Sequence, residues 1–344
     1  MNATARPTIG RVVLACCAAV LAAAACSADE LTGVWDTPIV TAVADPADLS
    51  PPLSDYANVL PDDPFMHEFR QISAWRWITC GVLIGGAITC IGDDSPRIVG
   101  LYPRPPTEVQ TAEFLQIANG SGFACGLLAD GTLRCGGFNG YRQSEPPSGT
   151  YTRVVASSGY ACALTPASNV VCWGDNEWGQ SEAPPGTYTH ISAGVSHACA
   201  LTPASNVVCW GDNEWGQSEA PPGTYTHISA GAGFTCALTT RDAALCWGDN
   251  EWGQSEAPPG TYTHISAGVS HACALTPASN VVCWGDNEWG QSEAPPGTYI
   301  DIAAGYRHTC ALTVNRKLDC WGTMHDDEDM PFNYEPAGFE RLYR

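Results

Sequence analysis

The sequence has little positive charge and no recognisable catalytic motif. Its 344 residues include 15 Lys and Arg against 36 Asp and Glu, the formal net charge is −21, and Lys317 is the only lysine. Nucleic acid is therefore not expected as a partner, because phosphate binding depends on Lys and Arg, whereas a cationic partner suits the field of such a chain. Nucleophile-elbow, P-loop and zinc-protease motifs are also missing, so we expect a non-enzymatic protein without a cofactor.

A hydrophobic run long enough to cross a bilayer is missing as well. The N-terminus has instead two arginines, Arg6 and Arg11, followed by the short apolar stretch VVLACCAAVLAAAA at residues 12–25, which is the pattern of an export signal. Small residues precede Cys26, as in bacterial lipoprotein signals. We predict a signal peptide at residues 1–25 and lipidation of Cys26, giving an outer-membrane or cell-surface lipoprotein that touches the membrane through this anchor only. Ordinary signal cleavage, giving a secreted or periplasmic protein, is the alternative.

Long helices are not expected either, because 35 Gly and 26 Pro favour turns. The segment 26–68 is rich in Pro, Asp and Ala and has no sustained hydrophobic periodicity. We interpret it as an extended tether to the domain that occupies residues 69–344. A packed strand around LTGVWDTPIVTAV is the alternative for part of the tether.

Cysteine, in contrast, is abundant and regularly spaced. Of the 17 cysteines, three belong to the signal region and the other 14 form pairs whose members lie ten positions apart. From the second pair onward the pairs recur every 37 residues, a period that indicates a repeat architecture. The pairs are Cys80–Cys90, Cys125–Cys135, Cys162–Cys172, Cys199–Cys209, Cys236–Cys246, Cys273–Cys283 and Cys310–Cys320.

One repeat is predicted to form three or four antiparallel strands. In HACALTPASNVVCWG, apolar and β-branched residues flank the turn-forming PASN. If Cys199 opposes Cys209, Ala200 faces Val208 and the two cysteines come within reach of a disulfide. With a further strand in TYTHISAG, the unit matches a propeller blade, and seven units predict an all-β, seven-bladed β-propeller with one intra-blade disulfide per repeat. The C-terminal FERLYR is a candidate for the strand that closes the ring.

Disulfides explain the cysteine pairs better than a metal does. Zinc sites use cysteines two to four positions apart, in sets of four. Pairs on facing strands of an exported chain fit disulfides instead. Each bridge closes a loop of about ten residues and stabilises its blade by about 2–3 kcal/mol in the chain-entropy model.

The string AGVSHACAL…VVCWGDNEWGQS resembles the repeat of the regulator-of-chromosome-condensation family, whose pattern is roughly A-G-x-x-H-[ST]-x-A-L and then W-G-x-N-x-x-G-Q-L. The resemblance recurs over about residues 69–344, and the paired cysteines resemble those of crinkly-type plant receptor kinases and of exported bacterial proteins, including a propeller inhibitor of β-lactamase. It implies a seven-bladed propeller. Guanine-nucleotide exchange, the founding member's activity, is not expected, because fold does not carry function across such a distance. The matching positions are Ala193, Gly194, His197, Ala200, Leu201, Trp210, Gly211, Asn213, Gly216 and Gln217.

The loop DNEWG supplies the candidate binding residues, and its GDNE is expected to form an Asx-type turn. Its tryptophan lies beside a glutamate where the family pattern is open, and aromatic rings beside carboxylates suit a basic protein partner. We predict binding of a protein through the loops or rim, as an enzyme inhibitor or a surface scaffold, and a carbohydrate-binding surface lipoprotein is the alternative. Recurrence alone does not establish a site, because Thr187–Gly223 and Thr261–Gly297 are identical and indicate recent duplication. The candidates are Trp178, Trp215, Trp252, Trp289, Glu177, Glu214, Glu251 and Glu288.

Two other repeat positions carry histidine in some units. Two residues before the first cysteine, histidine alternates with Phe, Tyr and Ile, so we interpret this position as packing. Seven residues earlier the position is always polar, so we expect it to be exposed. The first position holds Ile78, Phe123, Tyr160, His197, Phe234, His271 and His308, and the second holds Gln71, Gln116, Arg153, His190, His227, His264 and Asp301.

Overall fold

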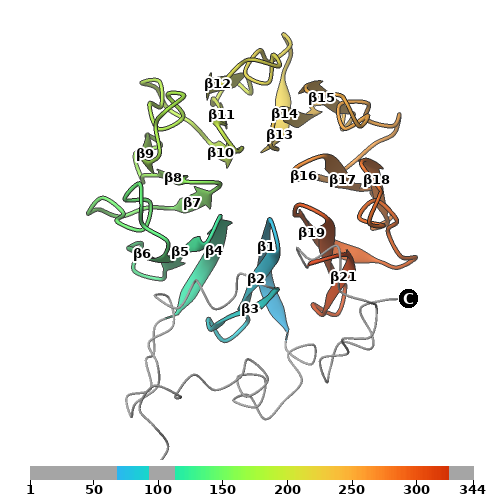
Figure 1. Cartoon of the computed structure of the whole chain (residues 1–344), viewed down its shortest axis with the longest axis horizontal. Coiled ribbons are helices and arrows are strands. Elements are labelled where there is room, and N and C mark those ends of the chain that lie inside the picture. The colour runs from blue at the N-terminus through green and yellow to red at the C-terminus, as the bar shows by residue number, and fades with distance from the viewer. Residues whose placement is uncertain (1–67, 93–112, 325–344) are drawn as a thin grey trace, which may run out of the picture. The chain divides into compact units, whose positions relative to one another are not determined.

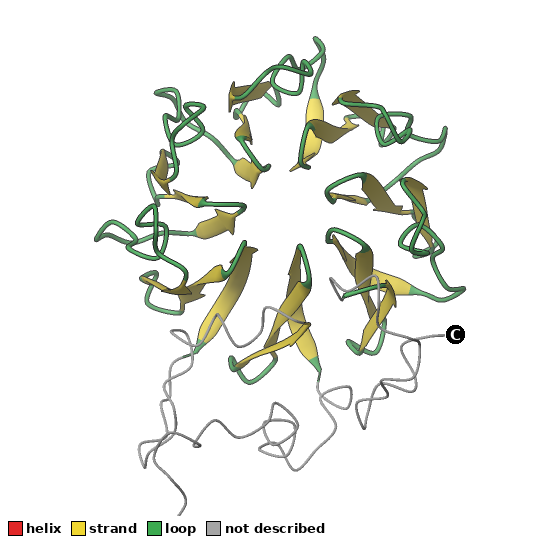
Figure 2. Cartoon of the chain, viewed as in Figure 1, coloured by secondary structure: helices red, strands yellow, loops and turns green. Residues whose placement is uncertain are grey.

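A computed structural model describes residues 68–92 and 113–324, and these form seven three-stranded antiparallel sheets. The sheets are arranged as blades around a central axis, with the first strand of each blade nearest the axis (Figures 1 and 2). This arrangement confirms the predicted seven-bladed β-propeller. The signal peptide, Cys26, the tether and FERLYR lie outside the described residues, so those predictions stay untested.

Each blade is one continuous stretch of chain whose strands pair in sequence order. Blades 1 to 3 consist of β1 (Phe69–Trp75), β2 (Ile78–Leu83) and β3 (Ile88–Gly92); β4 (Phe114–Gly120), β5 (Phe123–Leu128) and β6 (Leu133–Gly137); and β7 (Arg153–Ala156), β8 (Tyr160–Leu164) and β9 (Val170–Gly174). Blades 4 and 5 consist of β10 (His190–Ala193), β11 (His197–Leu201) and β12 (Val207–Gly211); and β13 (Tyr225–Ala230), β14 (Phe234–Thr239) and β15 (Ala244–Gly248). Blades 6 and 7 consist of β16 (His264–Ala267), β17 (His271–Leu275) and β18 (Val281–Gly285); and β19 (Tyr299–Ala304), β20 (His308–Thr313) and β21 (Leu318–Gly322).

The hairpin register inferred from the cysteine spacing is confirmed. Cys199 opposes Cys209 and Ala200 opposes Val208 between β11 and β12. The two cysteines are directly opposed in every blade and are bonded to each other, with Cα atoms 4.0–4.1 Å apart. Each blade therefore has the single disulfide that was predicted.

The hydrophobic core lies between the blades, because a three-stranded sheet is too small to enclose one. Each of the seven junctions has its own cluster of buried side chains. Between blades 3 and 4, for example, Tyr160 packs in one cluster with Ile191 and Trp210. The middle strand of a blade is covered on both faces, so β11 is buried along its whole length. Each blade is therefore stable only with its neighbours in place.

The ring closes by packing of the first described blade against the last. The Phe69 N–H donates to the Arg316 carbonyl (2.9 Å), and the Tyr306 N–H donates to the Arg76 carbonyl (3.1 Å). Phe69 also shares a buried cluster with residues of blade 7. Among the described residues the closure uses no strand shared between blades.

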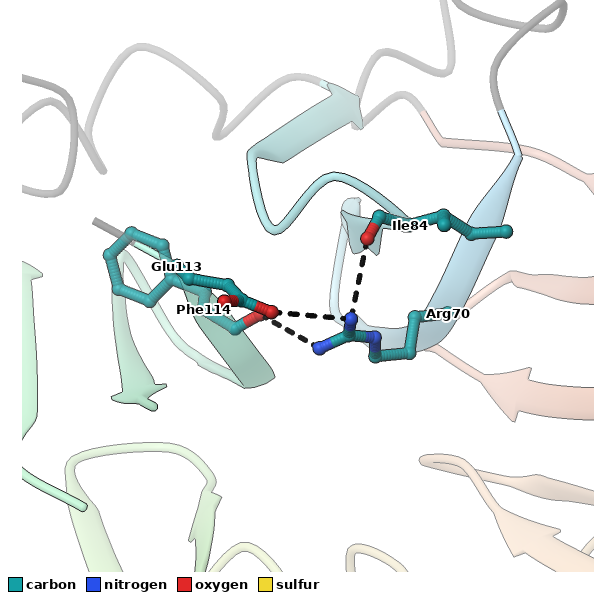
Figure 3. A network of polar contacts seen from close by, with 4 residues as sticks. All are labelled: Arg70, Ile84, Glu113 and Phe114. Carbon is teal, nitrogen blue, oxygen red and sulfur yellow. Dashed lines mark hydrogen bonds and ion pairs between the residues drawn. The ribbon is translucent and has the colours of Figure 1, made fainter. Parts of the chain in front are cut away.

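The junction between blades 1 and 2 has a polar link of its own. The Arg70 guanidinium donates to the carbonyl oxygens of Ile84 (3.3 Å) and Phe114 (3.5 Å) and meets the Glu113 carboxylate at 3.5 Å (Figure 3). Arg70 thus connects blade 1 to the start of blade 2. An ion pair as exposed as this one contributes only about 0–1 kcal/mol.

Candidate functional site

The loop that follows the third strand of each regular blade is held in shape by its own side chains. After β12, the Asp212 carboxylate accepts from the Glu214 N–H (3.0 Å), which is the Asx-type turn expected from GDNE. Asn213 donates its side-chain amide to Glu219 (2.9 Å) and accepts from the Ser218 N–H (3.0 Å). The same bonds recur after β9, β15 and β18. The loops are therefore preorganised, and a partner need not order them on binding.

A buried glutamine fastens each loop to the next blade. The Gln217 side-chain oxygen accepts from the Trp215 N–H (2.9 Å). Its backbone carbonyl accepts from the Trp247 indole N–H (2.9 Å) and from the Thr235 hydroxyl (3.0 Å), both in blade 5. Gly216, which stands between Trp215 and Gln217 in the chain, has φ +78°, a left-handed conformation that glycine adopts without strain. The result is that one tryptophan, Trp247, is buried while Trp215 is turned outward.

Five aromatic residues occupy this outward position in five successive loops, and we call them the aromatic row. Three of its tryptophans are well exposed: Trp215 at 61%, Trp178 at 46% and Trp252 at 45%. The row consists of Tyr141, Trp178, Trp215, Trp252 and Trp289.

The loops of the aromatic row lie on one face of the ring. The loop after β12 begins beside the turn that joins β10 to β11, where the Asp212 N–H donates to the Ser196 carbonyl (2.9 Å). Because every blade repeats this strand order, the row follows the face that carries the turns between first and second strands. The PASN turns between second and third strands lie on the opposite face.

Most of the predicted binding residues are at the surface, and their role in binding remains a prediction. Glu177, Glu214, Glu251 and Glu288 are exposed beside the row. Sequence reasoning missed Tyr141, which is 55% exposed, and its edge-to-face neighbour Phe138. The signal was available, because Tyr141 stands as far after Cys135 as Trp178 stands after Cys172.

Trp289 differs from the other members of the row because an arginine covers it. The Arg307 guanidinium lies 4.5 Å from the centroid of the Trp289 ring. It also lies 5.1 Å from the Tyr306 ring and 5.3 Å from the Trp77 ring. Three aromatic rings of blade 1, blade 7 and the preceding loop thus surround one cation, and Trp289 is less exposed than the other members of the row.

The first strands of all seven blades line a second candidate site, a central channel with a volume of about 310 Å³. The polar repeat position that was expected to be exposed faces this channel, where its side chains are exposed or partly exposed. The reason is that the first strand of each blade is the innermost one. The residues at this position are Gln71, Gln116, Arg153, His190, His227, His264 and Asp301.

The titratable side chains that line the channel are surrounded by protein although they also contact water, and this partial burial shifts their pKa values. Burial raises the pKa of Asp301 to about 6, against the opposing effect of backbone N–H groups and of the Arg153 charge. Burial lowers the pKa of His190, and the charges of Arg153 and His227 lower it further. The pKa values of His227 and His264 are also lowered, with burial as the largest cause. The channel thus favours neutral histidines.

The histidines two residues before the cysteine are fully buried, which confirms their packing role. The ring nitrogen Nε2 of His197 lies 2.8 Å from the Thr235 hydroxyl of the next blade. That hydroxyl donates to Gln217, so Nε2 is the protonated nitrogen of the histidine. Its Nδ1 is buried without a partner, and burial lowers the pKa of His197 to about 4.

The three buried histidines all meet a threonine of the next blade. His271 pairs with Thr309 and His308 pairs with Thr79, each at 2.8 Å. Where the position holds Phe234, Tyr160, Phe123 or Ile78 instead, the next blade has alanine in the place of the threonine. The histidines are therefore part of the packing between blades.

Within residues 68–92 and 113–324, no group of three or more His, Cys, Asp or Glu side chains has the geometry to hold a metal ion. The described residues also contain no helix long and apolar enough to cross a membrane.

Residues 188–217, 225–254, 262–291 and 299–327 match the family model of the regulator of chromosome condensation (RCC1) repeat. The resemblance inferred from the sequence is thus confirmed over four repeats. The three units before them lie outside this match, yet they form the same three-stranded blades. No curated protein sequence matches the chain.

Solved structures with the same fold include two plant receptor ectodomains. The CRINKLY WD40 ectodomain of the Arabidopsis thaliana receptor kinase ACR4 is 26% identical, with a TM-score of 0.60 over 73% of this chain and 93% of that chain. The ectodomain of the Physcomitrella patens receptor kinase CR4 is 24% identical, with a TM-score of 0.62 over 73% of this chain and 72% of that chain. Yeast RCC1 (Prp20), in a complex with Kap60, is 16% identical, with a TM-score of 0.59 over 76% and 81% of the two chains.

Proposed function

We propose, from a seven-bladed propeller that carries RCC1-type repeats, that the protein is a non-enzymatic binding protein and that it captures a protein partner on the aromatic row. Propellers of this type commonly mediate protein binding, and one solved structure has Kap60 bound to yeast RCC1. Seven intra-blade disulfides indicate an extracellular or otherwise oxidising compartment. Export by residues 1–25 and an anchor at Cys26 belong to the same proposal.

The observation that supports this function best is the exposure of large aromatic side chains on preformed loops. Trp178, Trp215 and Trp252 are each about half-exposed or more. Tryptophan and tyrosine are enriched among the residues that dominate the energy of protein interfaces. A row of such rings on one face gives a partner several anchor points without loop ordering.

The sharpest form of the proposal is inhibition, in which the aromatic face covers the active site of an exported enzyme. Such an inhibitor binds one enzyme at about nanomolar affinity and is not turned over. A surface scaffold would instead bind its partner without changing the partner's activity. Inhibition assays with the captured partner separate the two roles.

The test is affinity capture from exported and envelope proteins with the purified, oxidised chain as bait. The triple variant Trp178→Ala, Trp215→Ala, Trp252→Ala is expected to lose the captured protein. The control variant Leu245→Ala, Val314→Ala removes exposed apolar side chains outside the row and is expected to keep it. Equal capture by both variants would refute the row as the binding surface, and capture of glycan alone would favour the carbohydrate-binding alternative.

A further inference from the structure

The rings of the aromatic row differ in how far a residue of the next blade covers them. The residue 18 positions after each ring lies in the next blade, at the turn between its first and second strands. Where this residue is glycine, Trp215 is 61% and Tyr141 is 55% exposed. Where it is serine, Trp178 and Trp252 are 46% and 45% exposed. Where it is Arg307, the ring of Trp289 is covered by the guanidinium.

The geometry explains why this turn residue controls the exposure of the ring. A Cβ atom built on Gly233 would lie 3.5 Å from Cδ1 of Trp215. A Cβ atom built on Gly159 would lie 3.3 Å from Cδ2 of Tyr141. Any side chain at this position therefore starts in contact with the ring, and an arginine extends over it. At the other four rings of the row the same space holds only glycine or serine.

Each of the four open positions has an aspartate that the filled position lacks. An aspartate at the start of the next loop lies against the turn residue, and the Cβ of Asp249 would be 3.4 Å from a Cβ on Gly233. Asp175, Asp212 and Asp286 stand at the same repeat position beside the rings of Tyr141, Trp178 and Trp252. At the filled position the corresponding residue is Thr323. A cation at an open ring thus gains a carboxylate that Arg307 does not have.

We propose that each open ring of the aromatic row receives an arginine side chain of the protein partner, in the place that Arg307 occupies over Trp289. This inference rests on the proposed function and adds the chemistry of the partner. The partner presents several arginines at the spacing of successive blades. Lysine is a poorer occupant, because a planar guanidinium stacks on an aromatic ring and an ammonium does not.

The probe is a fluorescein-labelled peptide with several arginines separated by Gly-Ser spacers, together with its all-lysine counterpart. Binding to the oxidised full chain is measured by anisotropy at physiological ionic strength, where long-range attraction to the acidic chain is screened. We expect the arginine peptide to bind about ten-fold more tightly than the lysine peptide. Equal affinities would show that net charge alone drives binding and would overturn the inference.

The decisive variant fills the open rings with the protein's own arginines. Ser196→Arg, Gly233→Arg, Ser270→Arg places Arg307-like side chains over Trp178, Trp215 and Trp252. Gly233 lacks a left-handed φ, so an arginine fits its backbone. At about three-fold for each ring, we expect the arginine peptide to bind about 30-fold more weakly.

A matched control places the same added charge on the opposite face. Ala167→Arg, Ala204→Arg, Ala278→Arg lies in the PASN turns, where the side chains are exposed. This variant is expected to weaken binding by no more than about three-fold, through net charge alone. If the two triple variants weaken binding equally, the rings are not arginine sites.

Removal of the natural occupant tests the inference in the other direction and does not depend on the folding of the filled variant. Arg307→Ala uncovers Trp289, so we expect about three-fold tighter binding of the arginine peptide and stronger quenching of tryptophan fluorescence by acrylamide. Unchanged or weaker peptide binding, with quenching increased, would count against the inference.

The outcomes separate this inference from the proposed function. If a captured protein depends on Trp178, Trp215 and Trp252 but the arginine peptide does not compete with it, the function holds and the arginine inference fails. If the captured protein is kept by the triple alanine variant, the proposed function fails. Competition by the arginine peptide, lost in the self-filled variant, supports both.

Discussion

Each regular repeat carries two tryptophans five residues apart, and the structure gives them opposite surroundings. Trp247 is 8% exposed and donates its indole N–H to the Gln217 carbonyl of the preceding loop. Trp252 is 45% exposed, at the tip of its own loop. Both recur in the same four repeats, the first on a strand and the second in the loop after it, so recurrence does not distinguish a packing role from a surface role. Burial and hydrogen bonding do, and they assign the first tryptophan to the junction between blades.

The histidines divide in the same way. His271 is fully buried between blades 6 and 7 and is bonded to Thr309, whereas His264, seven residues earlier, faces the central channel. We call the buried repeat positions of tryptophan and histidine the buried rows and their accessible positions the exposed rows, and we expect different effects from changes in each. Changes in the buried rows should alter folding, and changes in the exposed rows should alter binding.

The largest expected effect is acid destabilisation by the buried histidines. Burial lowers the pKa of His197 and His308 to about 4 and of His271 to about 3. The unfolded chain binds these protons below about pH 6.5 and the folded chain does not, so each histidine lowers the unfolding free energy by about 1.4 kcal/mol for each pH unit down to about pH 4. Together the three histidines therefore lower the unfolding free energy by about 4 kcal/mol for each unit by which the pH falls.

Asp301 has the opposite effect and reduces the slope of the unfolding free energy against pH. Its pKa is raised to about 6, so the folded chain binds this proton before the unfolded chain does and gains stability as the pH falls below 6. For these four groups the net loss is about 3 kcal/mol per pH unit between roughly pH 6 and pH 4, and the lowered pKa values of His190, His227 and His264 add to it. Guanidinium unfolding at a series of pH values measures it. The pair variant His271→Phe, Thr309→Ala, which copies Phe234 and Ala272 of the preceding junction, should reduce the slope by about 1.4 kcal/mol per pH unit; an unchanged slope would refute the assignment.

The next largest effect separates the two tryptophans directly. Trp247→Ala removes a buried ring and leaves the Gln217 carbonyl without its donor, so the unfolding free energy should fall by about 3–5 kcal/mol. Trp252→Ala removes an exposed ring and should change it by less than about 0.5 kcal/mol. Denaturant unfolding of the oxidised protein measures both, and similar losses for the two variants would contradict the division into rows.

The architecture could be predicted from the sequence because its signal is local and repeated. Opposed cysteines in one hairpin fix the register, and the disulfide between Cys199 and Cys209 needs no long-range information. The surroundings of the channel could not be predicted in this way. They depend on which strand of a blade is innermost, and that follows only from closing the ring. The sequence therefore predicts that His190 and Asp301 are exposed, but it does not place them at the channel that they line.

The contact of Arg307 with the Trp289 ring could not be predicted from the sequence for the same reason. Arg307 touches Trp77, which is far away in the chain, because blade 7 lies beside blade 1. Pairing of histidine with threonine was detectable in principle. Each buried histidine has a threonine 38 residues later or, at the closure, Thr79, but this pattern is visible only after the blades are aligned around the ring.

A smaller effect is expected when the hydrogen bond between His197 and Thr235 is removed. Thr235→Val keeps the shape of the side chain but leaves the His197 Nε2–H and the Gln217 carbonyl without this partner. We expect a loss of about 2 kcal/mol. The control Thr226→Val changes an exposed threonine of the same blade and should cost less than about 0.5 kcal/mol. If Thr235→Val is as mild as the control, the bond between blades is not a source of stability.

The smallest effect belongs to Trp289, the one member of the aromatic row that is intermediate between the two environments. Arg307→Ala removes a cation that lies 4.5 Å from its ring at a partly exposed site, so the unfolding free energy should fall by only about 0.5–1 kcal/mol. The ring itself should become as accessible to acrylamide as Trp252, with Trp289→Phe in the same background identifying the signal. A loss as large as that of Trp247→Ala would place Arg307 among the packing residues of the ring closure. A small loss with increased quenching would instead place it over a surface ring that is otherwise built like the three exposed ones.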